Sequence, residues 1–317
     1  MKTGKIILLV FTVLFALVLI LIGSWATWEH HRDPLTAIDI DPGSIISVMD
    51  SAFTSDLIPQ SRTYRQIILI TEHIGKIEAL ISQPAIIPSQ GLPVVIILGG
   101  LEIGVENFQL IPDPGNNIII IYRYPYSPRY WYDGTALSQI PIIRRSVLNV
   151  PSQVLTLENW TSEQTWAGKD RICIIGYSFG ALFIPSVYHL AAYKNEHLQP
   201  GVIAYAGADI YELLKTNLKN LSQPFRTIVA WTASTAIYPV EPALHLPYMN
   251  NEFLVINGTK DHQISEYSWR KLHQLVPEPK KIILLDEGHM HPKKPELTMK
   301  LVQLSQEWLL EKGVINP

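Results

Sequence analysis

One short stretch constrains the fold of this chain more than any other. Residues 172–175 read Ile-Cys-Ile-Ile, and Gly-Tyr-Ser-Phe-Gly follows at once at 176–180. A continuous apolar run of this length is typical of a strand that is buried on both faces of a parallel sheet. Apolar residues at helical spacing come next, so the sequence predicts a strand, a tight turn and a helix that reaches residue 193. Pro185 lies early in that helix and predicts a kink in its first turns.

The turn between this strand and helix has a chemical pattern. Gly-x-Ser-x-Gly in this context is the nucleophile elbow, which forces strained backbone angles on its serine, here Ser178. The hydroxyl then points away from the sheet at a helix N-terminus, where backbone N–H groups can stabilise an oxyanion. The alternative is a glycine-rich turn whose serine only caps the helix.

Composition narrows the class of protein. Of 317 residues, 47% are hydrophobic and 17% are charged, which suffices for one large core. A net charge of −3 gives no reason to expect nucleic acid as a partner. The single cysteine, Cys173, lies in the apolar strand and is expected to be a buried apolar residue. A lone cysteine forms no intramolecular disulfide, so cysteine usage does not report the redox compartment.

The N-terminus, residues 1–28, predicts a membrane anchor. Lys2 and Lys5 precede the apolar run Ile6–Ile22, which as a helix is about 25 Å long, near the lower limit for crossing a bilayer. Trp25 and Trp28 suit the membrane–water interface. We therefore expect a single-pass protein whose body is extracytoplasmic and whose partner is the lipid bilayer. In the alternative, residues 24–26 (Ser-Trp-Ala) form a cleavage site, and the protein is secreted.

The remaining chain reads as an α/β fold. Residues 29–61 are interpreted as a linker, with a possible short helix over 44–53, and residues 62–317 as the body. Two runs, 64–71 and 76–82, indicate an antiparallel hairpin at the edge of the sheet. Further apolar strands alternate with helical segments, which predicts a mostly parallel sheet covered by helices on both faces. These strands are expected at 92–98, 117–122, 172–175, 201–205, 253–257 and 281–285.

Two aromatic segments interrupt this alternation. Residues 208–251 are long for a connection between strands and carry several aromatic residues and prolines, which indicates a small cap or an elaborate surface connection. Residues 122–132 leave the carboxyl end of a predicted strand, where α/β sheets bind ligands. We treat this second segment as a candidate wall of an acyl pocket.

A serine nucleophile needs a base and an orienting carboxylate, and two later strands supply both. The strand over 253–257 runs into Gly-Thr-Lys-Asp, which ends at Asp261, and the strand over 281–285 runs into a loop that ends in Gly288-His289. Gly288 is expected to let the chain turn so that His289 reaches back over the sheet edge. Asp209 follows another strand and is a rival for the acid. His289 and His291 suggest a metal pair, although no carboxylate or cysteine ligands stand at matching spacing.

The order Ser178, Asp261, His289, each after a strand, resembles that of the α/β-hydrolase superfamily over about residues 62–315. The initial hairpin and the cap look most like the branch of dienelactone hydrolases and acyl-peptidase-like esterases. The resemblance implies a serine hydrolase that cleaves small-molecule carboxylic esters without a cofactor.

The oxyanion donors implied by the resemblance are backbone amides. They would be those of Phe179 and of Leu101 or Gly100. The chain has Leu98-Gly99-Gly100 where many relatives have His-Gly-Gly. An acyltransferase, a peptidase and a non-catalytic extracytoplasmic binding module are the alternatives, and no sequence feature indicates an oligomeric state.

Overall fold

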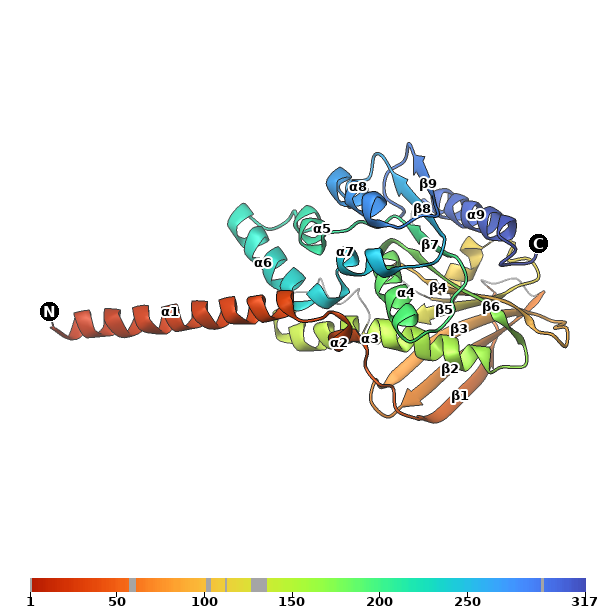
Figure 1. Cartoon of the computed structure of the whole chain (residues 1–317), viewed down its shortest axis with the longest axis horizontal. Helices are drawn as coiled ribbons and strands as arrows, with labels where there is room; N and C mark the ends of the chain where they lie inside the picture. Colours follow the sequence, from red (N-terminus) through yellow and green to blue (C-terminus); the bar gives the residue numbers. More distant parts are fainter. Residues whose placement is uncertain (1, 57–60, 101–103, 112, 127–135, 292–293) are drawn as a thin grey trace.

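A nine-stranded mixed sheet forms the centre of the body in the computed structural model, which describes residues 2–56, 61–100, 104–111, 113–126, 136–291 and 294–317 (Figure 1). The spatial order of the strands is β1-β2-β3-β5-β4-β6-β7-β8-β9. Their bounds are β1 Ile45–Phe53, β2 Arg62–Thr71, β3 Lys76–Pro84, β4 Leu92–Leu98, β5 Ile118–Arg123, β6 Ala167–Tyr177, β7 Gly201–Ala204, β8 Phe253–Gly258 and β9 Lys280–Leu285.

Helices of the body cover both faces of this sheet, whereas the N-terminal helix projects away from it (Figure 1). The α-helices are α1 Lys2–His31, α2 Leu35–Ile38, α3 Ala136–Ser162, α4 Ile184–Tyr193, α5 Ile210–Asn217, α6 Gln223–Ala236, α7 Pro242–His245, α8 Glu266–Leu275 and α9 Pro295–Glu311. Short 3₁₀ helices are η1 Val105–Leu110, η3 Ser178–Leu182, η4 Tyr238–Val240 and η5 Leu246–Tyr248.

The predicted sheet class is confirmed. β2 and β3 pair antiparallel as the expected hairpin, and β3 pairs antiparallel with β5. In the spatial order β5-β4-β6-β7-β8-β9, every neighbouring pair of strands is parallel. Because β4 lies between β5 and β6, the chain crosses the sheet from β5 through α3 to reach β6.

Strand β4 illustrates why the central strands are apolar throughout. Val94, Ile96 and Leu98 pack into one buried cluster with α3, α4 and α8, while Val95 and Ile97 pack into the other with η1 and α9. Successive side chains of a strand point to opposite faces, so a strand between two helical layers needs apolar residues at every position.

The expected helix over 44–53 is wrong, because residues 45–53 form the edge strand β1, antiparallel to β2. Its side chains are mostly exposed on both faces, so no burial pattern in the sequence marks it as a strand. The predicted linker, residues 29–61, therefore contains a strand of the sheet. It also contains α2, whose Leu35 and Ile38 are buried in the core.

The expected kinked helix after the elbow is also different. The chain makes the 3₁₀ helix η3 first, and α4 begins only at Ile184, so that Pro185 lies in the first turn of α4. Proline is tolerated there because the first N–H groups of a helix have no partner within the helix.

Candidate functional site

Ser178 lies at the turn between β6 and η3, at the carboxyl edge of the parallel strands. Its backbone has φ +52°, in the left-handed region that a non-glycine residue rarely adopts. The strain expected for an elbow serine is therefore present. Gly180 allows this turn, because a Cβ at that position would overlap the carbonyl oxygen of Leu98 at the end of β4.

The loops after β8 and β9 bring a carboxylate and an imidazole together. Parallel pairing continues past the ends of the strands, since the Thr259 amide donates to the Leu285 carbonyl oxygen at 2.8 Å and the Lys260 amide to that of Glu287 at 3.0 Å. The two loops are thereby fastened side by side. Asp261 follows on the first of these loops and His289 on the second, and their side chains are in contact.

Three side chains form one hydrogen-bonded line. Ser178 Oγ lies 2.8 Å from His289 Nε2, and His289 Nδ1 lies 2.6 Å from Asp261 Oδ2. A carboxylate only accepts hydrogen bonds, so Nδ1 carries the proton and Nε2 is free to accept from the serine hydroxyl. The exposed fractions of the His289 and Asp261 side chains are 8% and 0%. The line has the geometry in which a serine is activated as a nucleophile.

The Asp261 carboxylate is itself held in place. Its Oδ1 atom accepts from the backbone amides of Gln263 at 2.7 Å and Ile264 at 3.0 Å, which leaves Oδ2 directed at the imidazole. These two charge-assisted bonds fix the plane of the carboxylate.

The rival acid, Asp209, is engaged elsewhere. Its Oδ1 accepts from the Glu212 amide at the N-terminus of α5, and its Oδ2 pairs with Lys271 at 3.1 Å. The metal alternative at His289 and His291 gains no support, because within the described part of the chain no three His, Cys, Asp or Glu side chains are grouped to hold an ion.

The expected oxyanion donors are described only in part. Phe179 follows Ser178 in η3, and Gly100 follows the end of β4 next to the elbow, since the adjacent Gly99 and Leu98 face Gly180. Leu101, the other expected donor, lies outside the described residues. The first residues of η3 and the start of the loop after β4 thus lie at the same edge of the sheet as the serine.

Aromatic rings from the segment 122–132 pack against the elbow. The Tyr124 hydroxyl donates to the Gly99 carbonyl oxygen at 2.7 Å, and its ring meets that of Phe179 edge-on at 5.1 Å. Tyr122 is fully buried and donates to Gln153 at 2.8 Å. Tyr124 of the segment 122–132 thus packs beside the elbow, and residues 127–132 lie outside the described residues, so a pocket wall in this segment stays a prediction.

Tyr205 is a site residue that the sequence analysis missed. It follows β7 with φ +58°, is fully buried, and its ring meets the His289 ring edge-on at 5.5 Å. Burial and the nearby Asp261 raise the pKa of its hydroxyl, so the group stays neutral. Its position at the carboxyl end of a predicted strand was the available signal.

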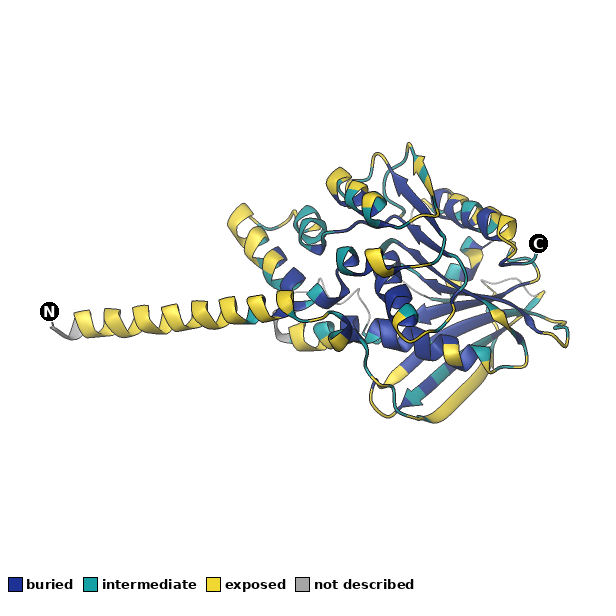
Figure 2. Ribbon diagram, in the orientation of Figure 1, coloured by how far each residue is buried: buried dark blue, intermediate teal, exposed yellow. Residues whose placement is uncertain are grey.

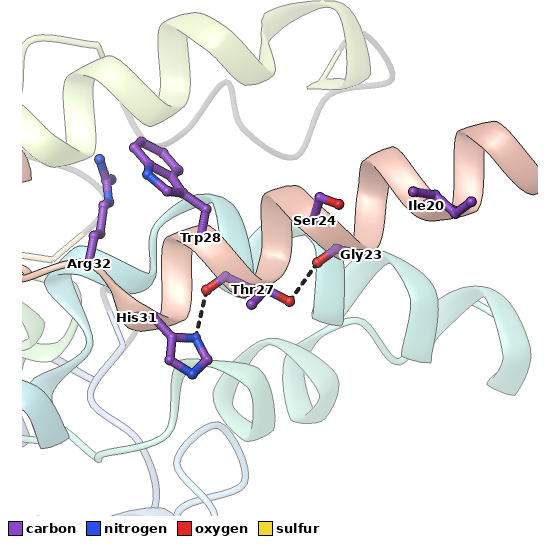
Figure 3. Close-up of a pocket in the computed structure, with 7 residues that line it drawn as sticks. All are labelled: Ile20, Gly23, Ser24, Thr27, Trp28, His31 and Arg32. Carbon is purple, nitrogen blue, oxygen red and sulfur yellow. Dashed lines mark hydrogen bonds between the residues drawn. The ribbon is translucent and has the colours of Figure 1, made fainter.

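Cys173 and a hollow beside α1 lie apart from the Ser178–His289–Asp261 line. Cys173 is fully buried in β6, and burial raises the pKa of its thiol to about 12, so it is not a thiolate nucleophile. An open hollow beside α1 is lined by residues between Ile20 and Arg32 (Figure 3). It belongs to the junction of α1 with the body.

Comparison with known proteins assigns the fold. No family model and no curated protein sequence matches this chain. Solved structures do match, and they show that the chain has the α/β-hydrolase fold. Among them are structures of the dienelactone-hydrolase and acyl-peptidase branch.

Three of these structures resemble most of the chain. An acetyl xylan esterase from Thermoanaerobacterium sp. JW/SL YS485 has a TM-score of 0.58 and 11% identity, over 89% of this chain and 92% of its own. An acetyl xylan esterase from Paenibacillus sp. R4 has a TM-score of 0.57 and 13% identity, over 89% and 94%. A putative dienelactone hydrolase from Klebsiella pneumoniae has a TM-score of 0.52 and 12% identity, over 82% and 98%. At these identities the likeness concerns the fold.

Proposed function

We propose that this chain is a membrane-anchored serine hydrolase that cleaves carboxylic esters or related acyl bonds. The observation that supports it best is the line from Ser178 through His289 to Asp261, with distances of 2.8 and 2.6 Å. Its position at the carboxyl edge of an α/β-hydrolase sheet agrees with this role. The esterase names among the structural neighbours point to the same reaction class.

The proposed reaction has two halves. Ser178 Oγ attacks the ester carbonyl while His289 Nε2 takes its proton, and the imidazolium then returns that proton to the leaving alcohol. The acyl-enzyme is hydrolysed by water through the same base. Asp261 stays ionised, keeps the imidazole in the required tautomer and stabilises the imidazolium.

The negative charge that develops on the carbonyl oxygen needs donors. We assign these to the backbone amides of Phe179 and Gly100 or Leu101, each donor contributing about 3–4 kcal/mol in comparable sites. No step of this mechanism uses a cofactor. Tyr124 and Phe179 would border the acyl group, because their rings pack beside the serine.

We propose that the chain consists of a membrane anchor and a hydrolase domain. Residues 1–28 would form the anchor and residues 62–317 the hydrolase domain, with a cap over 208–251. Helix α1 contains one stretch, Lys5–His31, that is long and apolar enough to cross a membrane, a property that a signal sequence near the N-terminus shares. Ala26 is buried against the body within an unbroken helix, which favours a retained anchor over a cleaved signal.

Labelling by a fluorophosphonate probe tests the proposal. The full chain in detergent is expected to react with the probe and to hydrolyse nitrophenyl acetate, whereas Ser178→Ala should do neither. Normal labelling and activity of Ser178→Ala would refute the assignment. Adding competing alcohols and amines to the assay distinguishes hydrolysis from acyl transfer, since a transferase would form the new ester or amide.

A further inference from the structure

Helix α6 presents an apolar stripe to the solvent. Phe225, Ile228 and Trp231 lie three residues apart, on one side of the helix, and are 65%, 59% and 38% exposed. The opposite side, with Ala230 and Ser234, is buried against the body. Figure 2 shows that the exposed part is the half that projects away from the body. An aromatic and aliphatic stripe of this kind marks a surface that contacts another apolar phase.

The end of α1 is fastened to the body beside α6. Glu29, 1% exposed, pairs with Arg144 on α3 at 2.6 Å and with Arg32 at 2.7 Å. The His30 ring stacks on Tyr238, just after α6, with centroids 4.1 Å apart. In Figure 3 the end of α1 runs between the ribbons of α3 and α6. The direction of α1 therefore fixes the orientation of the body relative to any membrane that α1 crosses.

The apolar run of α1 ends very near these contacts. Ala26, the first buried residue of α1, comes four residues after Ile22, which is about 6 Å along a helix axis. The headgroup layer on each side of a bilayer is of similar thickness, about 5–7 Å. The body must then begin inside that layer. Figure 1 shows that α6 projects from the body in the direction of the N-terminus of α1, so its free end lies nearest the bilayer.

We propose that the apolar stripe of α6 is inserted into the headgroup region of the leaflet from which α1 emerges. This rests on the proposed anchor. Ile140 and Ile142, exposed near the start of α3, would contact the same leaflet on the other side of α1. Interfacial helices bind in this way, with aromatic and aliphatic side chains buried in the acyl boundary.

Insertion of α6 into the headgroup region turns the candidate active site toward the lipid. Helix α3 follows the parallel strand β5, so its first turns, which hold Arg144, lie at the carboxyl edge of the sheet. The segment containing α6 likewise leaves the carboxyl end of β7. Ser178 lies at that same edge. The substrate class that suits this arrangement is an amphipathic acyl ester that is presented at a membrane surface.

Site-specific fluorescence in vesicles tests whether the apolar stripe of α6 lies in the headgroup region. Native Cys173 is fully buried, so an introduced surface cysteine can be labelled selectively with an environment-sensitive fluorophore. We would label Ile228→Cys in the full chain, reconstituted in phosphatidylcholine vesicles with or without doxyl-labelled lipid. The matched control is Ile86→Cys, an 84% exposed isoleucine after β3, at the amino edge of the parallel strands.

The expected result is that doxyl lipid quenches the label at position 228 by more than about half, as for an interfacial helix, and leaves position 86 nearly unaffected. Equal quenching at both positions, whether strong or absent, would overturn the placement. Leu14→Cys, in the middle of α1, separates the two proposals. If position 14 is quenched and position 228 is not, the anchor stands and the α6 contact is wrong. If position 14 is not quenched, the anchor fails, and with it the α6 contact.

Discussion

Ser178 Oγ and His289 Nε2 lie 2.8 Å apart in the free protein. The distance is already that of a hydrogen bond, so no rearrangement is required to form the contact. Both groups come from loops that are fixed by neighbours, Ser178 by the packing of the elbow on β4 and His289 by the carboxylate of Asp261. The site is thus preorganised, which is the condition for efficient proton transfer.

Replacing Asp261 by asparagine is expected to lower kcat for nitrophenyl acetate by about 10³–10⁴-fold, with KM changed little, as in comparable triads. The amide can donate to Nδ1 and so favours the wrong tautomer of His289. Steady-state kinetics measure the effect. Asp209→Asn is the matched control, because Asp209 caps α5 and pairs with Lys271 instead of with His289. If Asp209→Asn proved the more damaging change, the assignment of the acid would be reversed.

Gly180→Ala is expected to destabilise the protein by about 1–3 kcal/mol and to lower esterase activity strongly, because the new methyl group overlaps backbone atoms of Leu98 and Gly99. Thermal unfolding and kinetics report the two effects. Gly288→Ala is the control, since a Cβ there would lie 3.6 Å from the Lys260 carbonyl oxygen, an ordinary contact. Gly288 is not in the left-handed region, so the turn before His289 does not depend on glycine. Equal melting temperatures for the two variants would contradict this reading.

Tyr205→Phe is expected to leave the stability unchanged or to raise it slightly. The Tyr205 hydroxyl is buried and has no hydrogen-bond partner among the described residues, so removing it relieves a desolvated polar group. Tyr177→Phe should instead cost about 1 kcal/mol, because the Tyr177 hydroxyl donates to Ser305 at 2.9 Å. Denaturant unfolding compares the two. A larger loss for Tyr205→Phe would show that this hydroxyl has a partner.

Glu158 gives a pH-dependent prediction. Burial, with a smaller effect from Glu196, raises the pKa of its carboxyl from 4.5 to about 7. Between these values the folded state binds the proton more tightly than the unfolded state, so this group lowers stability as pH rises through the window. Glu158→Gln removes that cost, and we expect it to stabilise the protein by up to about 3 kcal/mol at pH 8, with no gain at pH 4.

Unfolding measurements across this pH range test the prediction for Glu158. Glu163→Gln serves as the control, because Glu163 is an exposed acid just beyond the end of α3. The argument fails if Glu158→Gln is no more stable than Glu163→Gln above pH 7.

The local patterns of the sequence determined the central strands, the hairpin of β2 and β3, and the elbow at Ser178. Each is encoded by residues close together in the chain. A strand between two helical layers must be apolar at every position, and Gly180 must lack a side chain where it meets Leu98. Edge strand β1 could not be predicted from local patterns. Its side chains are mostly exposed and carry no burial pattern, and its backbone pairs with β2.

Tertiary structure alone decided which of these local features meet. Ser178 and His289 are 111 residues apart, and their contact depends on β7 and β8 lying between β6 and β9 in the sheet and on backbone bonds that join the two last loops. The burial of Glu29 likewise depends on Arg144, 115 residues away. Such pairings are set by the order of strands and the packing of layers, and periodicity along one segment has no information about either.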